Sequence, residues 1–351
     1  MYDIAIIGAG PAGSVFAAEI SKLMPEYKIL IVDGQGQDNK KVCGGLLAPD
    51  AQKELSKLNL TLPNHILADP QIFEVETIDL HKKIKRYYQR HYLNMDRYSF
   101  DRWLFSFIPD SVDVLNGRCL GITEGDKCYN LKIKGSNTEY SVSTKILVGA
   151  DGGNSIIRRT FFKDKLKKYT SIQQWFVNEG KPLPYYSCIF DKKTSDSCSW
   201  TIYKDKYVIF GGAFESENCR KAYDEQKKRL ENYLNCSFGA PIKTEACLLS
   251  SPRRWKDFIT GKDNIFLLGE AAGFISSSSF EGISSAMISG KMLASSFTNC
   301  TKIKKIQKTY KRKALKLKIK LFTKIIKRCI LCSPFLRYII MKSGITSVNK
   351  Y

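Results

Sequence analysis

Histidine is scarce in this sequence, and paired cysteine motifs are missing. Among 351 residues there are only three histidines, His65, His81 and His91, and they cannot form a zinc site without cysteines at ligand spacing. The single C-x-x-C motif, at Cys329 and Cys332, has no second such motif to pair with and is interpreted as a packing feature. The sequence therefore predicts no metal site.

Acidic residues are absent from the carboxyl-terminal segment. Residues 300–351 hold 16 of the 56 Lys and Arg residues and none of the 34 Asp and Glu residues, which leaves 40 basic against 34 acidic residues elsewhere. Most of the formal charge of +22 therefore belongs to this tail. Because the rest of the chain is only mildly basic, we predict no nucleic-acid partner.

Long apolar runs and a secretory leader are also missing. No stretch of 18 apolar residues could span a bilayer, although 43% of the residues are hydrophobic, enough for a substantial core. No leader precedes the first apolar run, and the 11 cysteines are odd in number and irregularly spaced, which favours free thiols. We therefore expect a cytoplasmic protein.

The amino-terminal segment carries a dinucleotide-binding pattern. An apolar run at 3–7 leads into Gly8, Gly10 and Gly13, in the order G-x-G-x-x-G, and then into a helical pattern. The first glycine permits a tight turn, the second a close approach to a pyrophosphate, and the third close helix–strand packing. A second apolar run ends at Asp33, where a carboxylate can accept hydrogen bonds from an adenosine ribose. The pattern predicts a dinucleotide site without specifying the dinucleotide.

Two later segments return to the same kind of turn. Residues 145–155 and 264–273 each begin with an apolar strand and end in a glycine-rich turn beside an acidic residue, Asp151 or Glu270. Such turns direct backbone N–H groups towards a ligand. A chain that comes back three times to one site suggests a long, bent dinucleotide such as FAD.

The order of these motifs resembles that of the FAD-dependent oxidoreductases of the geranylgeranyl-reductase group, which share their fold with the aromatic-hydroxylase flavoproteins. Residues 41–45 resemble the K-x-C-G-G segment of that group, and residues 97–104 resemble its R-x-x-F-D-x-x-L helix start. Residues 43–52, 172–176 and 185–191 are similar to the bacterial CbrA-like branch. The resemblance covers nearly the whole chain.

The resemblance implies an α/β fold, in which a Rossmann-like FAD-binding domain is combined with an antiparallel β-sheet substrate domain and a C-terminal helical tail. The expected FAD domain is discontinuous (1–60, 94–162 and 252–299), the substrate domain comprises 61–93 and 163–251, and the basic tail comprises 300–351. The residues implied to contact the cofactor are Gly8, Gly10, Ala12, Gly13, Asp33, Cys43, Gly44, Gly45, Arg97, Asp151, Gly152, Gly269, Glu270, Gly273, Gly282 and Ile283.

Three departures from the family pattern concern the third motif and the substrate site. Glu270 stands where the group usually has aspartate, and serines at 276–279 occupy a loop in which proline is common. Of the Y-x-W-x-F-P signature of the lipid reductases, only Trp200 remains. FAD binding is expected to survive these changes, whereas the identity of the substrate does not follow from them.

Alternating apolar and polar residues predict the strands of the substrate sheet and a strand of the FAD domain, at 71–78, 85–93, 128–133, 187–191, 199–203 and 207–212. An exposed amphipathic helix is expected at 222–234. Aromatic rings on the sheet would exclude water and hold an apolar substrate, with core packing as the alternative. We predict a substrate pocket with Trp175, Tyr186 and Trp200. The further candidates are Phe176, Tyr185, Phe214, Gln173 and Gln174.

Cys43 is the one candidate for a catalytic side chain, because the resemblance places its segment near the flavin ring. It could donate a proton or could shape the face of the flavin.

Three functions stay open at this point. The first is reduction of double bonds in an apolar, isoprenoid-like lipid by hydride transfer from reduced flavin, with NAD(P)H as a candidate electron donor. The second is a flavin monooxygenase on the same fold. The third is a non-catalytic flavin- or lipid-binding membrane accessory protein. The fold alone does not separate them.

The basic tail is predicted to be helical. Apolar residues at i+3 and i+4 spacing from Ile303 to Ile325 predict one amphipathic helix at 301–328, with lysines on its remaining faces, and Pro334 breaks the pattern. The apolar stripe could pack on the FAD domain, and the basic face could dock residues 301–342 on an anionic membrane surface. Such docking would place the protein peripherally on the inner face of the membrane.

Overall fold

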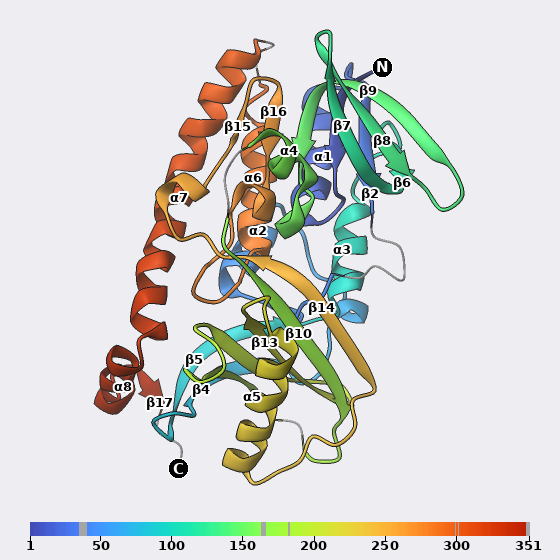
Figure 1. Cartoon of the computed structure of the whole chain (residues 1–351). Helices are drawn as coiled ribbons and strands as arrows, with labels where there is room; N and C mark the ends of the chain where they lie inside the picture. Colours follow the sequence, from blue (N-terminus) through green and yellow to red (C-terminus); the bar gives the residue numbers. More distant parts are fainter. Residues whose placement is uncertain (35–40, 163–165, 182, 299, 301, 349–351) are drawn as a thin grey trace.

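The computed structural model describes residues 1–34, 41–162, 166–181, 183–298, 300 and 302–348. The predicted boundaries at 163, 299 and 351 and the predicted helix start at 301 lie outside these residues. Two β-sheets follow one another along the long axis of the molecule, and helix α7 (Ile303–Cys332) runs along one side (Figure 1).

The first sheet has a parallel centre. Its strands are β1 (Tyr2–Ile7), β2 (Ile29–Asp33), β6 (Asp113–Asn116), β7 (Arg118–Gly125), β8 (Cys128–Lys134), β9 (Glu139–Gly149), β15 (Gly261–Lys262) and β16 (Ile265–Leu267). β1 pairs in parallel with β2 and β9, and β9 pairs in parallel with β16. The carboxyl ends of β1, β9 and β16, each followed by a glycine motif, therefore meet at one edge.

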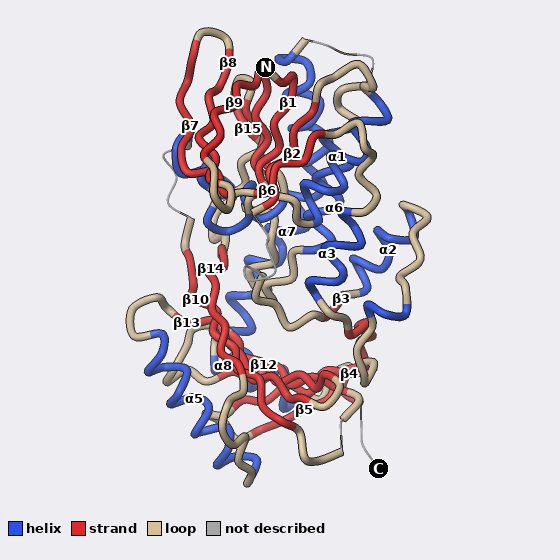
Figure 2. Tube along the Cα trace, turned by 90° about the vertical axis from the view of Figure 1, so that its right-hand side faces the viewer, coloured by secondary structure: helices blue, strands red, loops and turns tan. Residues whose placement is uncertain are grey.

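Helices lie beside this sheet (Figure 2). They are α1 (Pro11–Leu23), α2 (Pro49–Lys57), α3 (Arg97–Phe105), α4 (Ile156–Phe161) and α6 (Ile283–Ala294), with single turns at Asn64–Ile66, Gly152–Asn154, Trp255–Asp257 and Gly269–Ala272. α1 and α4 contact its strands, α6 and α3 pack on α1, and α2 packs on α6. α1 begins with Pro11, favoured there because its missing N–H would have no helical partner. α6 packs closely on α1, since a Cβ at Gly290 would lie 2.7 Å from the Ala12 carbonyl oxygen.

The second sheet is curled and mixed rather than antiparallel throughout. Its strands are β3 (Leu46–Leu47), β4 (Ile72–Asp79), β5 (Ile84–Asn94), β10 (Lys168–Val177), β11 (Tyr185–Phe190), β12 (Cys198–Lys204), β13 (Tyr207–Phe214), β14 (Lys243–Ser250) and β17 (Ser347–Val348). β4 and β11 pair in parallel, so the expectation of an antiparallel sheet is wrong at this pair. In the sequence, β4 and β11 are separated by strands β6 to β9 of the first sheet. No hairpin therefore joins them and forces them to run in opposite directions.

One helix covers the outer side of this sheet. α5 (Cys219–Leu234) begins three residues before the predicted 222–234 and buries Tyr223, Gln226 and Leu230. The Tyr223 hydroxyl donates to the Phe210 carbonyl oxygen at 3.1 Å, which fixes the helix on β13.

The tail forms two helices, α7 and α8 (Pro334–Ser343). The predicted amphipathic helix is confirmed, and it continues to Cys332, four residues beyond its expected end. Its inner side buries Ile306, Tyr310 and Leu317, and the Tyr310 hydroxyl donates to the Leu267 carbonyl oxygen at 2.9 Å. Pro334 ends the first helix and begins the second. Within the described ranges, none of the helices is long and apolar enough to cross a bilayer.

Candidate functional site

A cavity of about 530 Å³ is lined by residues of both sheets. Segments of all three glycine motifs reach it, together with residues 41–44 and side chains of the second sheet. Fourteen of the predicted site residues line this cavity: Gly8, Gly10, Ala12, Cys43, Gly44, Arg97, Asp151, Gly152, Gly269, Glu270, Gly282, Ile283, Tyr186 and Trp200. Gly13, Asp33, Gly45, Gly273 and Trp175 lie outside its lining.

The first motif presents the amino terminus of α1 to the cavity. Gly8 has φ +104°, and a Cβ there would lie 2.5 Å from the Ala150 carbonyl oxygen, so only glycine fits this turn. A Cβ at Gly13 would lie 1.9 Å from the Gly8 carbonyl oxygen, so Gly13 supports the packing of helix on strand. At Gly10, by contrast, a Cβ would meet no described atom within 4 Å. This open space beside unpaired helix N–H groups suits a phosphate.

Asp33 lies beside the cavity, between the lining residues Val32 and Gly34. Its buried carboxylate accepts a hydrogen bond from the Arg102 guanidinium at 2.7 Å. Arg102 therefore competes with a ribose for the carboxylate of Asp33. The sequence analysis missed this contact, although Arg102 lies within the R-x-x-F-D-x-x-L segment.

The second motif contributes a carboxylate with one buried oxygen that lacks a hydrogen-bond partner among the described residues. Asp151 Oδ2 accepts a hydrogen bond from the Ile156 N–H at 2.7 Å, whereas Oδ1 is buried and has no hydrogen-bond partner among the described residues. Burial raises the pKa of Asp151, against the lowering effect of the Ser155 hydroxyl and nearby backbone N–H groups. Asp151 thus lines the cavity and holds, at Oδ1, an acceptor that no described residue uses.

In the third motif, both carboxylate oxygens of Glu270, the residue that departs from the family pattern, have partners. Glu270 Oε1 accepts a hydrogen bond from the Ser250 N–H, and Oε2 pairs with Lys41 Nζ, each at 2.8 Å. Burial lowers the pKa of Lys41, but the Glu270 carboxylate outweighs this effect and leaves the pKa raised. The longer side chain thus ties the 41–45 segment to β14, while Gly273, at φ +80°, closes the turn outside the cavity.

Cys43 lies at the boundary between the glycine motifs and the second sheet. Its Sγ accepts a hydrogen bond from the Gly45 N–H at 3.4 Å. A Cβ at Gly44 would lie 2.4 Å from Ile202 Cδ1, so this segment packs tightly on β12. Gly45, at φ +67°, provides the turn.

Two buried cations lie near Cys43. Arg97 donates to the Asp101 carboxylate at 2.8 Å. Burial lowers the pKa of Arg97, but the interactions with Asp101 and, to a smaller extent, with Cys43 outweigh this effect and leave the pKa raised. Lys204 donates to Asn94 Oδ1 at 2.8 Å and to the Met95 carbonyl oxygen at 2.6 Å. Burial lowers the pKa of Lys204 to about 8, and Cys43 acts in the opposite direction. Nothing in the sequence pattern identified Lys204, which sits at the end of an ordinary strand.

The second-sheet side of the cavity is aromatic and apolar. The rings of Tyr92 and Tyr186 meet edge to face, 5.2 Å apart, and Trp200 and Ile202 add further apolar surface. The Tyr92 hydroxyl donates to Glu281 Oε1 at 2.7 Å, and Arg90 donates to both Glu281 oxygens at 3.1 Å. Trp200 Nε1 is buried without a hydrogen-bond partner in the described part of the chain.

Several predicted pocket residues face elsewhere. Trp175 donates through Nε1 to Glu245 Oε2 at 2.8 Å and packs against Tyr207. The Tyr185 ring packs on Tyr87, away from its cavity-lining neighbour, because successive residues of a strand point to opposite faces. Phe176, Phe214 and Gln174 are buried within the sheet and its cover. Gln173 is also buried, but its Nε2 donates to the Cys43 carbonyl oxygen at 3.5 Å and to Glu245 Oε2 at 2.9 Å.

Protein CbrA of Escherichia coli O6:H1 is 43% identical to this chain, over 99% of this chain and 94% of that protein. The chain belongs to the CbrA family. No family model matches the chain. The resemblance to the CbrA-like branch is thereby confirmed, and it extends across the whole length of the chain.

Two solved structures establish the fold class. A geranylgeranyl bacteriochlorophyll reductase-like protein from Thermoplasma acidophilum aligns with a TM-score of 0.78 at 19% identity, over 95% of this chain and 88% of that one. PqsL of Pseudomonas aeruginosa, a probable FAD-dependent monooxygenase, aligns with a TM-score of 0.72 at 13% identity, over 98% of this chain and 99% of that one. This CbrA-family chain therefore has the mixed α/β fold of flavin-dependent oxidoreductases.

Proposed function

We propose that the protein is an FAD-dependent oxidoreductase that reduces double bonds of an apolar, isoprenoid-like lipid. The observation that carries the proposal is the division of one cavity into two unlike parts. One part is bounded by glycine turns and a helix amino terminus, which suit a dinucleotide, and the other by aromatic and aliphatic side chains, which suit an apolar substrate.

The polar part offers suitable groups along a dinucleotide. The N–H groups at the start of α1, beside Gly10 and Ala12, would bind the pyrophosphate. Asp151 and the start of α6, at Gly282 and Ile283, also line the cavity and would contact other parts of FAD. When bound, FAD supplies transfer of a hydride equivalent, and the protein positions the reacting partners.

The chain's own residues would orient the substrate and exclude water. Tyr92, Tyr186 and Trp200 would hold an apolar chain against the flavin. Cys43 is the proposed group beside the reacting atoms, and the buried side chains of Arg97 and Lys204 lie near it. A thiol in this position can donate a proton to the substrate carbon that does not receive hydride.

Turnover under controlled oxygen separates this proposal from its alternative. Protein reconstituted with FAD, reduced anaerobically and mixed with a geranylgeranyl-chain lipid should yield product heavier by two hydrogens per reduced bond. Product that forms only with oxygen and incorporates labelled oxygen would instead favour a monooxygenase, the activity suggested for one of the proteins with this fold. Flavin that binds but is reduced by neither NADH nor NADPH would exclude both nucleotides as donors; flavin that no reductant bleaches would support the accessory-protein alternative.

Neighbouring tyrosines provide a matched pair for the substrate site. Tyr186→Ala should lower turnover and raise KM for the lipid while leaving the bound-flavin spectrum unchanged, because Tyr186 lines the apolar part of the cavity. Tyr185→Ala removes the same side chain from the opposite face of β11 and should leave KM unchanged. Equal effects of the two substitutions would count against the proposed substrate site.

A further inference from the structure

Helix α8 exposes its apolar residues and buries its charged one. Phe335, Leu336, Ile339 and Ile340 lie on its outer side, with 69% of Phe335 and 48% of Ile339 accessible to solvent. Arg337, in contrast, is buried on the inner side. This is the reverse of the usual arrangement for a surface helix in water.

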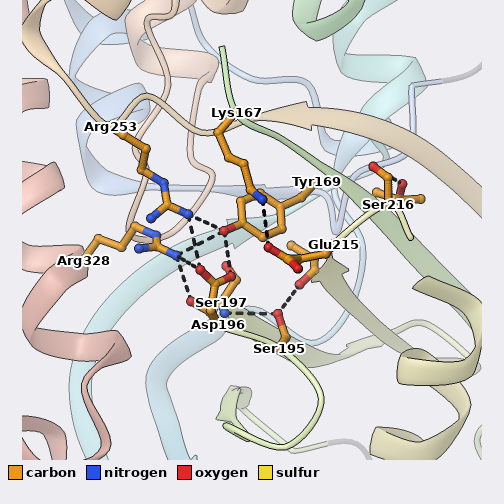
Figure 3. Close-up of polar contacts among 11 residues, drawn as sticks. Lys167, Tyr169, Ser195, Asp196, Ser197, Glu215, Ser216, Arg253 and Arg328 are labelled. Carbon is orange, nitrogen blue, oxygen red and sulfur yellow. Dashed lines mark hydrogen bonds and ion pairs between the residues drawn. The ribbon is translucent and has the colours of Figure 1, made fainter. Parts of the chain in front are cut away.

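Two ion pairs, one of them fully buried, hold the tail in this orientation. The Arg337 guanidinium donates to the buried Asp79 carboxylate at 2.9 Å and to the Leu331 carbonyl oxygen at 2.6 Å. Near the end of α7, Arg328 donates to the Asp196 carboxylate at 2.8 Å and to the Tyr169 hydroxyl at 3.2 Å (Figure 3). Because these contacts anchor the inner sides of α7 and α8 to the rest of the protein, the apolar side of α8 faces solvent.

Helix α7 carries a second apolar stripe that the sequence analysis missed. Leu315, Ile319 and Ile326 are exposed, so its outer side is not covered by lysines alone. At 100° per residue these three positions align on one side, opposite the buried stripe of Tyr310 and Leu317. We call these three residues, with Phe335, Ile339 and Ile340, the outer apolar face.

Basic side chains flank the α7 part of this face. Lys308, Lys311, Arg312 and Lys316 are all exposed, and residues 300–351 include no acidic residue. Exposed apolar residues between positive charges match the interfacial region of a bilayer, where acyl chains lie beneath anionic headgroups. A second copy of the chain fits less well, because two such tails would repel each other.

We propose that the outer apolar face docks the protein on a bilayer that contains anionic lipids. The same stretch of α7 passes near the apolar part of the cavity. Lys320 pairs with Asp50 of α2 at 2.8 Å, and α2 also contributes the lining residue Ala51. Lys327 of α7 also lies close enough to Arg90 and Glu281 to interact with their charges. Docking would therefore bring this end of the cavity close to membrane lipids, whatever reaction the cavity supports.

Vesicle co-sedimentation of the full chain tests this docking. Phosphatidylcholine vesicles with added phosphatidylglycerol should bind the protein, vesicles of phosphatidylcholine alone should bind it several-fold less, and salt should weaken the binding. Absence of binding, or equal binding to both kinds of vesicle, would overturn the proposal.

Two sets of substitutions identify the surface. Phe335→Ser with Ile339→Ser should weaken binding at least about tenfold, because two apolar side chains that would enter the bilayer are lost. The control, Phe73→Ser with Val177→Ser, removes apolar side chains that are comparably exposed on the second sheet and should have no effect. Replacing Lys308, Lys311, Arg312 and Lys316 by Gln should abolish the preference for anionic vesicles.

Two further results would overturn the assignment. One is unchanged binding of the Phe335→Ser, Ile339→Ser protein, with its melting temperature preserved. The other is a vesicle-free dimer, detected by sedimentation velocity, that this double substitution dissociates, since it would assign the face to a second copy of the chain.

Discussion

A side chain at position 10 should prevent cofactor binding without unfolding the protein. Gly10 has φ −71° and ψ −175°, a backbone conformation that other residues adopt without strain. A Cβ built there meets no described atom within 4 Å. Gly10→Val would therefore fold, but it would place two methyl groups where a pyrophosphate approaches the first turn of α1.

The size of the effect follows from the hydrogen bonds at this helix end. A hydrogen bond to a charged group contributes about 1.5–3 kcal/mol. Displacing a pyrophosphate from two helix N–H groups should therefore weaken FAD binding by about 3–6 kcal/mol, or roughly 10²- to 10⁴-fold in Kd.

Fluorescence titration of the apoprotein with FAD measures this Kd, and circular dichroism gives Tm. Gly121→Val is the matched control, because a Cβ at Gly121 also meets no described atom within 4 Å but lies on β7, outside the cavity lining. It should leave the Kd unchanged. A folded Gly10→Val protein that binds FAD as tightly as the unsubstituted protein would refute the proposed phosphate site.

Three further substitutions test buried contacts of the fold. Tyr310→Phe leaves the buried Leu267 carbonyl without its donor, so urea unfolding should show a loss of about 1–3 kcal/mol in the free energy of unfolding; no loss would contradict this contact. Arg337→Met leaves Asp79 buried without its guanidinium and should cost about 3–5 kcal/mol, whereas the exposed Arg312→Met should cost little; similar costs would contradict the buried pair. Burial holds the pKa of Lys204 at about 8, below its ordinary value of 10.5, so the unfolded chain binds more protons between these values and the free energy of unfolding should rise with pH across this window. In Lys204→Met that rise should shrink by up to about 3 kcal/mol, and an unchanged pH profile would contradict the buried lysine.

Local patterns predicted the elements that surround the phosphate site. The apolar runs and glycine spacing at 3–13 placed β1 and α1, because each feature of that motif depends on residues close in sequence. The same reasoning predicted the strands β9 and β16, since each is an uninterrupted apolar run followed by a glycine turn. The inner stripe of α7 was equally readable, because its period of 3.6 residues extends over many turns.

Long-range pairings were outside the reach of these patterns. Lys41 and Glu270 are 229 residues apart in the chain, and no local feature indicates that they meet. The parallel pairing of β4 with β11 joins two segments that are separated in the sequence by strands of the first sheet, so no turn between them indicates their relative direction. The alternation in β11 could not decide which face meets the cavity, so Tyr185 and Tyr186 were both candidates although only Tyr186 lines it.

The composition of the tail also concealed its outer side. Lysines at many positions of α7 suggested faces that were entirely basic, and nothing in the sequence indicated that Arg337 lies on the inner side of α8. Arg337 is inside because Asp79 is there to receive it, a contact that joins residues 258 positions apart.

The central claim is that three glycine motifs form one FAD site in this chain. The most direct measurement is the stoichiometry of FAD bound to the purified, folded protein, from the absorbance of the flavin released on denaturation. The account predicts one FAD per chain after reconstitution with excess FAD, and a stoichiometry near zero for Gly10→Val. A folded, unsubstituted protein that binds no FAD under the same conditions would contradict the claim.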